Sequence, residues 1–259
     1  MKLLVSLLLS SILFSCAHGH KKEISYKANG LEMKGYYVAA KGQGYKRPGV
    51  LVVHEWWGHN EYTRQRAEML ADMGYHALAI DMYGDGKTAD HPKQAGEFSG
   101  MVMKNMPEAK KRFEAALKTL KSMPGVDQDN IAAIGYCFGG GIVLNMARMG
   151  VDLKGVASYH GPLATATPAK KGQVKAEIMV FNGESDPMVS SKDVAQFEKE
   201  MKSANAKFKV VNYKGAKHGF TNPEATAKGE KFGLPLAYDE KADKDSWAQT
   251  QEFFKRIFK

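Results

Sequence analysis

The sequence predicts a doubly wound α/β domain, with a mostly parallel sheet and helices on both of its faces. Three apolar runs, at 49–54, 76–82 and 131–136, have the length and composition of buried central strands. Amphipathic segments at 62–73 and 107–123 have the apolar spacing of helices and lie between these strands. Strand and helix therefore alternate along the chain, and no linker rich in Pro, Gly or Ser divides it.

The remaining predicted elements continue this alternation. Two short segments, 24–27 and 33–39, are expected to form an opening antiparallel pair with a turn at 29–30. Further strands are predicted at 153–159, 177–181 and 208–213, and further helices at 139–149, 191–204 and 244–258. The least regular stretches, 84–100 and 215–236, are predicted as long loops of the kind that shape binding sites.

The length and composition are those of a soluble globular protein. The chain has 259 residues, of which 44% are hydrophobic and 25% charged. This balance excludes a wholly disordered chain, a collagen-like fibre and a polytopic membrane protein. The 37 basic and 28 acidic residues give a net charge of +9, but the lysines are spread along the chain. We therefore interpret the charge as a solvated basic surface and expect no nucleic-acid partner.

The first residues predict export from the cytoplasm. A basic residue precedes an apolar run at 3–14, which is too short to span a membrane and suits a signal peptide. The run leads to Cys16, as in a bacterial lipoprotein signal; an ordinary cleaved signal is the alternative. We expect a signal peptide over 1–15, a lipidated cysteine and tether over 16–22, and one domain over 23–259. The mature protein would then be periplasmic and anchored to a membrane by its lipid.

A glycine-flanked cysteine stands where a predicted strand passes into a predicted helix. Residues 135–139 read GYCFG, which is the cysteine form of the G-x-S-x-G nucleophile elbow. The flanking glycines leave room for the sharp turn because they carry no Cβ. Such a turn presents Cys137 at a helix N-terminus, whose positive dipole end stabilises a thiolate. Cys137 is therefore the candidate nucleophile, and a buried structural cysteine is the alternative.

A nucleophilic cysteine needs a general base and a group that orients the base. Asp186 follows the predicted strand at 177–181, on the sheet edge where open α/β sheets hold their sites. Glu184 is the alternative acid in the same turn. His218 follows the predicted strand at 208–213 and is the candidate general base. The chain order of nucleophile, acid and histidine is the order that accompanies this type of elbow.

The same architecture needs two N–H donors for the oxyanion that forms during acyl transfer. One donor is expected from Phe138, the residue after the candidate nucleophile. The other is expected from the loop after the early central strand, where Trp56 is the candidate. The adjacent Trp57 is expected either to form an apolar wall of the pocket or to pack in the core.

Four motifs together resemble those of the dienelactone hydrolase family. They read HEWWG at 54–58, GYCFGG at 135–140, GESDP at 183–187 and HGF at 218–220. The resemblance implies an α/β-hydrolase fold and a Cys137–His218–Asp186 triad, and it implies no metal or organic cofactor. It also implies that Glu55 pairs with the resting thiol and moves away when substrate binds. A carboxylate in that place would disfavour the thiolate and protect it from idle oxidation.

The resemblance also reveals a difference in substrate. Family members that act on dienelactone hold its carboxylate with arginines, one after the strand at 76–82 and one a few residues after the histidine. Here residues 81–86 read DMYGDG, and Asn222 stands in the second place. Because Asn does not supply the charge of an Arg fork, dienelactone is not the expected substrate. Asn222, Tyr83 and His160 are further candidates for lining the pocket.

These residues predict a hydrolase that transfers the acyl group of a carboxylic ester, lactone or thioester to water. The expected partners are a small ester or lactone substrate and, through the N-terminal lipid, a membrane. The protein is expected to be a monomer or a weak oligomer. The alternative is a non-catalytic, membrane-anchored lipoprotein that uses the same fold to bind a ligand. The complete set of triad residues argues against that alternative.

Overall fold

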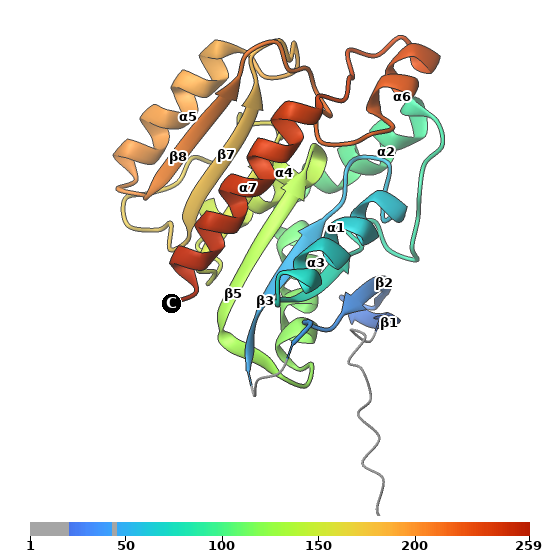
Figure 1. The fold of residues 1–259 in the computed structure, drawn as a ribbon, viewed down its shortest axis with the longest axis vertical. Helices are drawn as coiled ribbons and strands as arrows, with labels where there is room; N and C mark the ends of the chain where they lie inside the picture. The colour runs from blue at the N-terminus through green and yellow to red at the C-terminus, as the bar shows by residue number, and fades with distance from the viewer. Residues whose placement is uncertain (1–20, 43–45) are drawn as a thin grey trace, which may run out of the picture.

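The computed structural model describes residues 21–42 and 46–259. These residues form one sheet of eight strands with helices packed on both of its faces (Figure 1). In chain order the strands are β1 (Lys21–Ala28), β2 (Leu31–Val38), β3 (Arg47–Val53), β4 (His76–Ile80), β5 (Val126–Tyr136), β6 (Gly155–Tyr159), β7 (Glu177–Gly183) and β8 (Phe208–Tyr213). The helices are α1 (Glu61–Asp72), α2 (Pro92–Met103), α3 (Met106–Lys121), α4 (Phe138–Arg148), α5 (Ser191–Ser203), α6 (Ala225–Phe232) and α7 (Glu240–Ile257).

The sheet is antiparallel at one edge and parallel elsewhere. Its strand order is β1-β2-β4-β3-β5-β6-β7-β8. The pairs β1–β2 and β2–β4 are antiparallel, and all the pairs from β4 to β8 are parallel. Parallel neighbours need crossover connections, which contain helices here except between β6 and β7, where residues 160–176 form no helix. The predicted class, a doubly wound and mostly parallel sheet, is confirmed.

Each face of the sheet is covered by its own apolar core. Helices α1 and α7 pack on one face, where Leu70 and Phe254 are fully buried. Helices α3, α4 and α5 cover the other face with side chains that include Phe113, Ile142 and Phe197. The central strands lie between these two layers and are buried on both faces. Their sequences are therefore the continuous apolar runs from which they were predicted.

The two segments predicted as long loops contain helices, so this part of the prediction is wrong. Helix α2 begins at Pro92, directly after His91, whose side chain accepts a hydrogen bond from a backbone N–H of the first turn. Helix α6 lies in the second segment. Both helices contain internal glycine, which disfavours a helix, and both bury few side chains. The internal glycines favoured a loop in the local sequence, and the helices were missed for this reason.

The start of the chain differs from the prediction at one point. Strand β1 begins at Lys21, and Lys21 and Lys22 pair with Val38 and Tyr37 of β2. These two lysines therefore belong to the sheet and not to the predicted tether. The predicted signal peptide, Cys16 and the tether up to residue 20 lie outside the described residues. Within the described ranges, no helix is long and apolar enough to cross a membrane.

Candidate active site

The turn between β5 and α4 has the strained geometry of a nucleophile elbow. Cys137 is the N-cap residue of α4, with φ 52° and ψ −119°, a backbone conformation that costs free energy for any residue except glycine. A Cβ on Gly135 would lie 2.1 Å from the carbonyl oxygen of Gly139, and a Cβ on Gly139 would lie 2.4 Å from that of Val53. Neither position has room for a side chain. The turn therefore requires both glycines and presents the free, half-buried thiol of Cys137 at the carboxyl edge of the sheet.

Two of the predicted catalytic side chains meet beside this thiol. The Nδ1 atom of His218 lies 2.8 Å from Oδ2 of Asp186, and both residues are buried. The other carboxylate oxygen of Asp186 accepts the backbone N–H of Met188 at 2.8 Å. Glu184, the alternative acid, is exposed. The geometry therefore favours Asp186 as the partner that orients the imidazole.

The second nitrogen of His218 is available to the thiol. The Nε2 atom is buried and has no hydrogen-bond partner among the described residues, and His218 and Cys137 line the same cavity. Burial alone would lower the pKa of His218, but the negative charges of Cys137 and Asp186 outweigh burial and raise this pKa to about 10. The charged, imidazolium form of His218 is therefore favoured at this place.

Two backbone N–H groups beside the cavity are free to bind an oxyanion. Phe138 is the first residue of α4, where an N–H has no partner within its own helix. The N–H of Trp56 donates no hydrogen bond within the described part of the chain. Both residues line the cavity that contains Cys137. Phe138 and Trp56 are the two residues predicted as donors from the sequence, and their role stays a prediction.

Two buried side chains that sequence reasoning missed, His54 and Asp81, hold the loops after β3 and β4. The Nδ1–H of His54 donates to the carbonyl of Glu55 at 2.5 Å, and its Nε2 accepts the N–H of Met82 at 3.2 Å. Asp81 accepts four backbone N–H groups, three of them from the loop after β4. His54 belongs to the HEWWG motif, which was the available signal, whereas nothing in the local sequence distinguishes Asp81.

The carboxylate of Glu55 is held by an amide. Asn222 donates from Nδ2 to Oε2 of Glu55 at 2.6 Å, and both side chains are buried. Burial raises the pKa of Glu55, although the hydrogen bond from Asn222 and the charges of Lys228 and His218 oppose this rise. The sequence predicted a contact between Glu55 and the resting thiol. In the structure the hydrogen bond of the carboxylate is made with Asn222.

The cavity above the thiol is small and apolar. Its volume is about 200 Å³. Its lining residues are Trp56, Ser99, Met103, Cys137, Phe138, Pro162, Met188, Val189 and His218. The ionisable groups in this lining are the thiol of Cys137 and the imidazole of His218. Ser99 and Met103 both belong to α2. Of these two, Ser99 lies within the segment 84–100, which was predicted to shape the site but was predicted as a loop.

Four residues predicted as pocket candidates lie behind or beside this cavity and do not line it. Tyr83 is buried and donates its hydroxyl to the carbonyl of Trp56 at 2.9 Å. His160 is fully buried and Asn222 is bound to Glu55. Trp57 lines a separate groove on the surface. Each of these residues follows a strand at the correct sheet edge, but Tyr83, His160 and Asn222 are buried behind the cavity and Trp57 faces its separate groove.

The described residues do not indicate a metal centre. No group of His, Cys, Asp or Glu within residues 21–42 and 46–259 is arranged to hold a metal ion. The groups that the structure brings together at the site are a thiol, an imidazole, a carboxylate and two backbone N–H donors.

The mostly parallel sheet and the strained elbow between β5 and α4 together define an α/β-hydrolase. Residues 33–258 match the sequence profile of the dienelactone hydrolase family, and the chain belongs to this family.

Individual relatives resemble the chain over nearly its whole length. A dienelactone hydrolase-like promiscuous phosphotriesterase from metagenomic libraries superposes with a TM-score of 0.84 at 30% identity, covering 92% of this chain and 98% of that one. The structure named m3DLH superposes with a TM-score of 0.87 at 32% identity, covering 93% and 99%. Protein usf of Aquifex pyrophilus is 29% identical over 238 residues, which are 90% of this chain and 96% of that protein.

Proposed function

We propose that this member of the family cleaves a carboxylic ester, lactone or thioester through the triad Cys137, His218 and Asp186. The observation that carries the proposal is the buried His218–Asp186 hydrogen bond beside the strained elbow that presents the thiol. A nucleophile, a base within its reach and a group that orients the base are the parts that covalent acyl transfer needs.

The proton and the acyl group move in two steps. His218 holds the proton drawn from the Cys137 thiol, and the thiolate attacks the carbonyl carbon. The N–H groups of Phe138 and Trp56 stabilise the oxyanion, each by about 3 kcal/mol. The imidazolium then gives its proton to the leaving alcohol or thiol, and a thioester to Cys137 remains. Water attacks this thioester with His218 as base, and the acid and the free thiol are released.

The cavity selects an uncharged, compact acyl group. It offers no Arg or Lys to a substrate carboxylate, and the arginines expected for dienelactone are replaced at 81–86 and at Asn222. A carboxylate bound there would lose its hydration without gaining a cation, which is unfavourable. We therefore expect neutral short-chain esters, lactones or thioesters to be better substrates than dienelactone.

A neutral phosphotriester is a second candidate substrate. The relative from metagenomic libraries, 30% identical to this chain, is described as a promiscuous phosphotriesterase. The cavity of this chain is lined by no Arg, Lys, Asp or Glu, which suits a neutral triester. The Cys137 thiolate would attack phosphorus and expel an aryloxide. Water would then release the phosphodiester from sulfur.

A substrate panel tests the proposal. The purified protein is assayed with a short-chain aryl ester, a thioester, a dienelactone and a neutral aryl phosphotriester, each against the Cys137→Ala variant. The proposal predicts turnover of the ester or thioester, little turnover of dienelactone, and loss of activity in the variant. Wild-type activity in folded Cys137→Ala protein would disprove the mechanism. If no substrate is turned over and the thiol alkylates no faster than an ordinary cysteine, the non-catalytic binding alternative gains support.

We also propose that the protein is exported and anchored to a membrane by a lipid on Cys16. The segment before residue 21 has the sequence of an export signal that ends at Cys16, and lipid on this cysteine would keep the hydrolase at a membrane. Mass spectrometry of the mature N-terminus in cells tests this directly. A lipidated Cys16 in the membrane fraction, lost in Cys16→Ser, supports the anchor, whereas an unmodified N-terminus contradicts it.

A further inference from the structure

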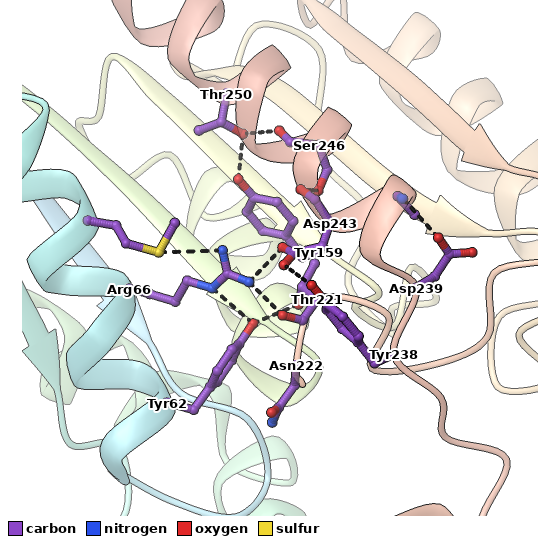
Figure 2. A network of polar contacts seen from close by, with 12 residues as sticks. Tyr62, Arg66, Tyr159, Thr221, Asn222, Tyr238, Asp239, Asp243, Ser246 and Thr250 are labelled. Carbon is purple, nitrogen blue, oxygen red and sulfur yellow. Dashed lines mark hydrogen bonds and ion pairs between the residues drawn. The ribbon is translucent and has the colours of Figure 1, made fainter. Parts of the chain in front are cut away.

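A buried arginine joins three parts of the protein behind the site (Figure 2). Arg66 of α1 donates from Nη2 to Asp243 of α7 at 2.6 Å and to the carbonyl of Thr221 at 2.5 Å. Its Nε donates to the hydroxyl of Tyr62 at 3.2 Å. Arg66 therefore fixes the backbone of the loop that begins with His218, relative to two helices on one face of the sheet.

The side chain of Thr221 continues this network toward the elbow. Its hydroxyl lies 2.7 Å from the hydroxyl of Tyr62 and 2.8 Å from Nε2 of His160. The other ring nitrogen of His160, Nδ1, accepts the backbone N–H of Cys137 at 3.1 Å. The same N–H also points to the carbonyl of Tyr159 at 3.0 Å. A continuous path of hydrogen bonds thus runs from the loop of the base to the main chain of the nucleophile.

The path defines which nitrogen of His160 carries its proton. Because a backbone N–H can only donate, Nδ1 must accept and therefore holds no proton. The single ring proton is then on Nε2, where it can be donated to the Thr221 hydroxyl. Burial, together with the charges of His218 and Arg66, lowers the pKa of His160 well below its usual value. The ring therefore stays neutral, and the nearness of His218, whose ring centroid is 5.1 Å away, favours this.

We propose that Thr221 is a positioning residue that couples the general base to the nucleophile. Its hydroxyl keeps His160 in the Nε2–H tautomer and so holds the strained backbone at Cys137, while its carbonyl, bound by Arg66, holds the loop of His218. The inference rests on the proposed triad chemistry. It assigns a function to Arg66, His160 and Thr221, which are buried and polar but do not line the cavity.

The test compares two buried threonines with the same substitution. Thr221→Val removes the hydroxyl and keeps the shape, and Thr221→Ser keeps the hydroxyl. Thr250→Val is the matched control, because Thr250 is also fully buried and its hydroxyl contacts the Tyr159 hydroxyl and the Ser246 carbonyl, with no path through His160. Turnover of the aryl ester and alkylation of Cys137 by iodoacetamide are both measured.

Thr221→Val should lower kcat about tenfold with little change in KM, because a displaced reacting group impairs chemistry more than binding. Alkylation of Cys137 should slow by a similar factor. Thr221→Ser should recover most of both rates, and Thr250→Val should change neither rate. Both Val variants should lower Tm by a few degrees. Equal kinetic losses in Thr221→Val and Thr250→Val, or unchanged kinetics in Thr221→Val, would overturn the proposal.

A spectroscopic readout does not depend on turnover. In ¹⁵N-labelled wild-type protein, His160 should give the signals of a neutral ring with Nε2 protonated, over the whole range from about pH 6 to 9. A protonated Nδ1 would overturn the inference, and so would a doubly protonated ring. If Thr221→Val does not fold, the tautomer of His160 in this wild-type spectrum tests the inference instead. If Cys137→Ala retains activity, the triad proposal fails, while the tautomer and the alkylation rates still judge the role of Thr221.

Discussion

Asn222 donates a 2.6 Å hydrogen bond to the buried carboxylate of Glu55. This contact joins the loop after His218 to the loop that carries Trp56, so the base and the oxyanion donor are tied together through a single amide. It occurs at the place where relatives acting on dienelactone are expected to present an arginine. The hydrogen bond of Glu55 is therefore made with a neutral amide, and no cation of the described residues forms a salt bridge with its carboxylate.

Glu55→Gln should therefore stabilise the protein at neutral pH. The pKa of Glu55 is raised by burial, so the folded state favours the neutral carboxyl, and its contribution to stability is present below about pH 4.5 and lost as the pH rises above it. Gln resembles the neutral form and should gain about 1–3 kcal/mol at pH 7. Urea unfolding should show this gain vanishing below about pH 4.5. A less stable Gln variant at pH 7 would show that the charge is well solvated or paired.

The same variant also tests the predicted restraint on the thiol. If the charge of Glu55 disfavours the thiolate, Cys137 in Glu55→Gln should alkylate several-fold faster than in the wild type. Glu252→Gln is a suitable control, because Glu252 is an exposed residue of α7 whose salt bridge is with Lys255. An unchanged alkylation rate in Glu55→Gln would remove Glu55 from the control of the thiol.

The raised pKa of His218 predicts how stability depends on alkaline pH. A pKa raised to about 10 contributes stability that is fully present below the unfolded-state value of about 6.5, and this stability is lost as pH rises through about 10. The charge of Cys137 is the largest of the effects that raise this pKa. Over this pH window the free energy of unfolding should therefore fall less steeply in Cys137→Ala than in the wild type. Parallel curves for the two proteins would show that Cys137 does not raise the pKa of His218.

The elbow should not tolerate a single added methyl group. Gly139→Ala places a Cβ about 2.4 Å from a backbone carbonyl oxygen that cannot move easily, so we expect a loss of more than about 2 kcal/mol in the free energy of unfolding. Gly96→Ala is the control, since a Cβ at Gly96 in α2 meets nothing within 4 Å. That change should be neutral or stabilise by up to about 1 kcal/mol. Similar losses in both variants by thermal unfolding would show that the close packing of the turn is not what requires glycine.

Local sequence was sufficient to predict the strands and the elbow. A buried parallel strand has a continuous apolar sequence, and the sharp turn at Cys137 needs glycine on both sides, so both features are visible within a few residues. Asp186 and His218 could be placed because each directly follows a strand whose end lies at the same sheet edge. Their hydrogen bond then follows from topology.

The supporting groups could not be predicted in the same way. Arg66 bonds to Thr221 and Asp243, which lie 155 and 177 positions away in the chain, and no local pattern indicates such partners. Tyr83 and His160 were placed at the correct edge of the sheet, but a position after a strand does not show whether a side chain turns into the cavity or into the core. Both turn into the core, where their polar atoms bind backbone groups.

The most direct measurement of the central claim is the identification of the residue that carries the acyl group. The protein is mixed with a large excess of an acetyl aryl ester, quenched in acid within milliseconds, digested, and analysed by mass spectrometry. The account predicts an acetyl group on Cys137, formed and lost at rates that account for turnover, with longer-lived acetylation in His218→Asn. Rapid turnover with no acetyl group on Cys137, or with the acetyl group on another residue, would contradict it.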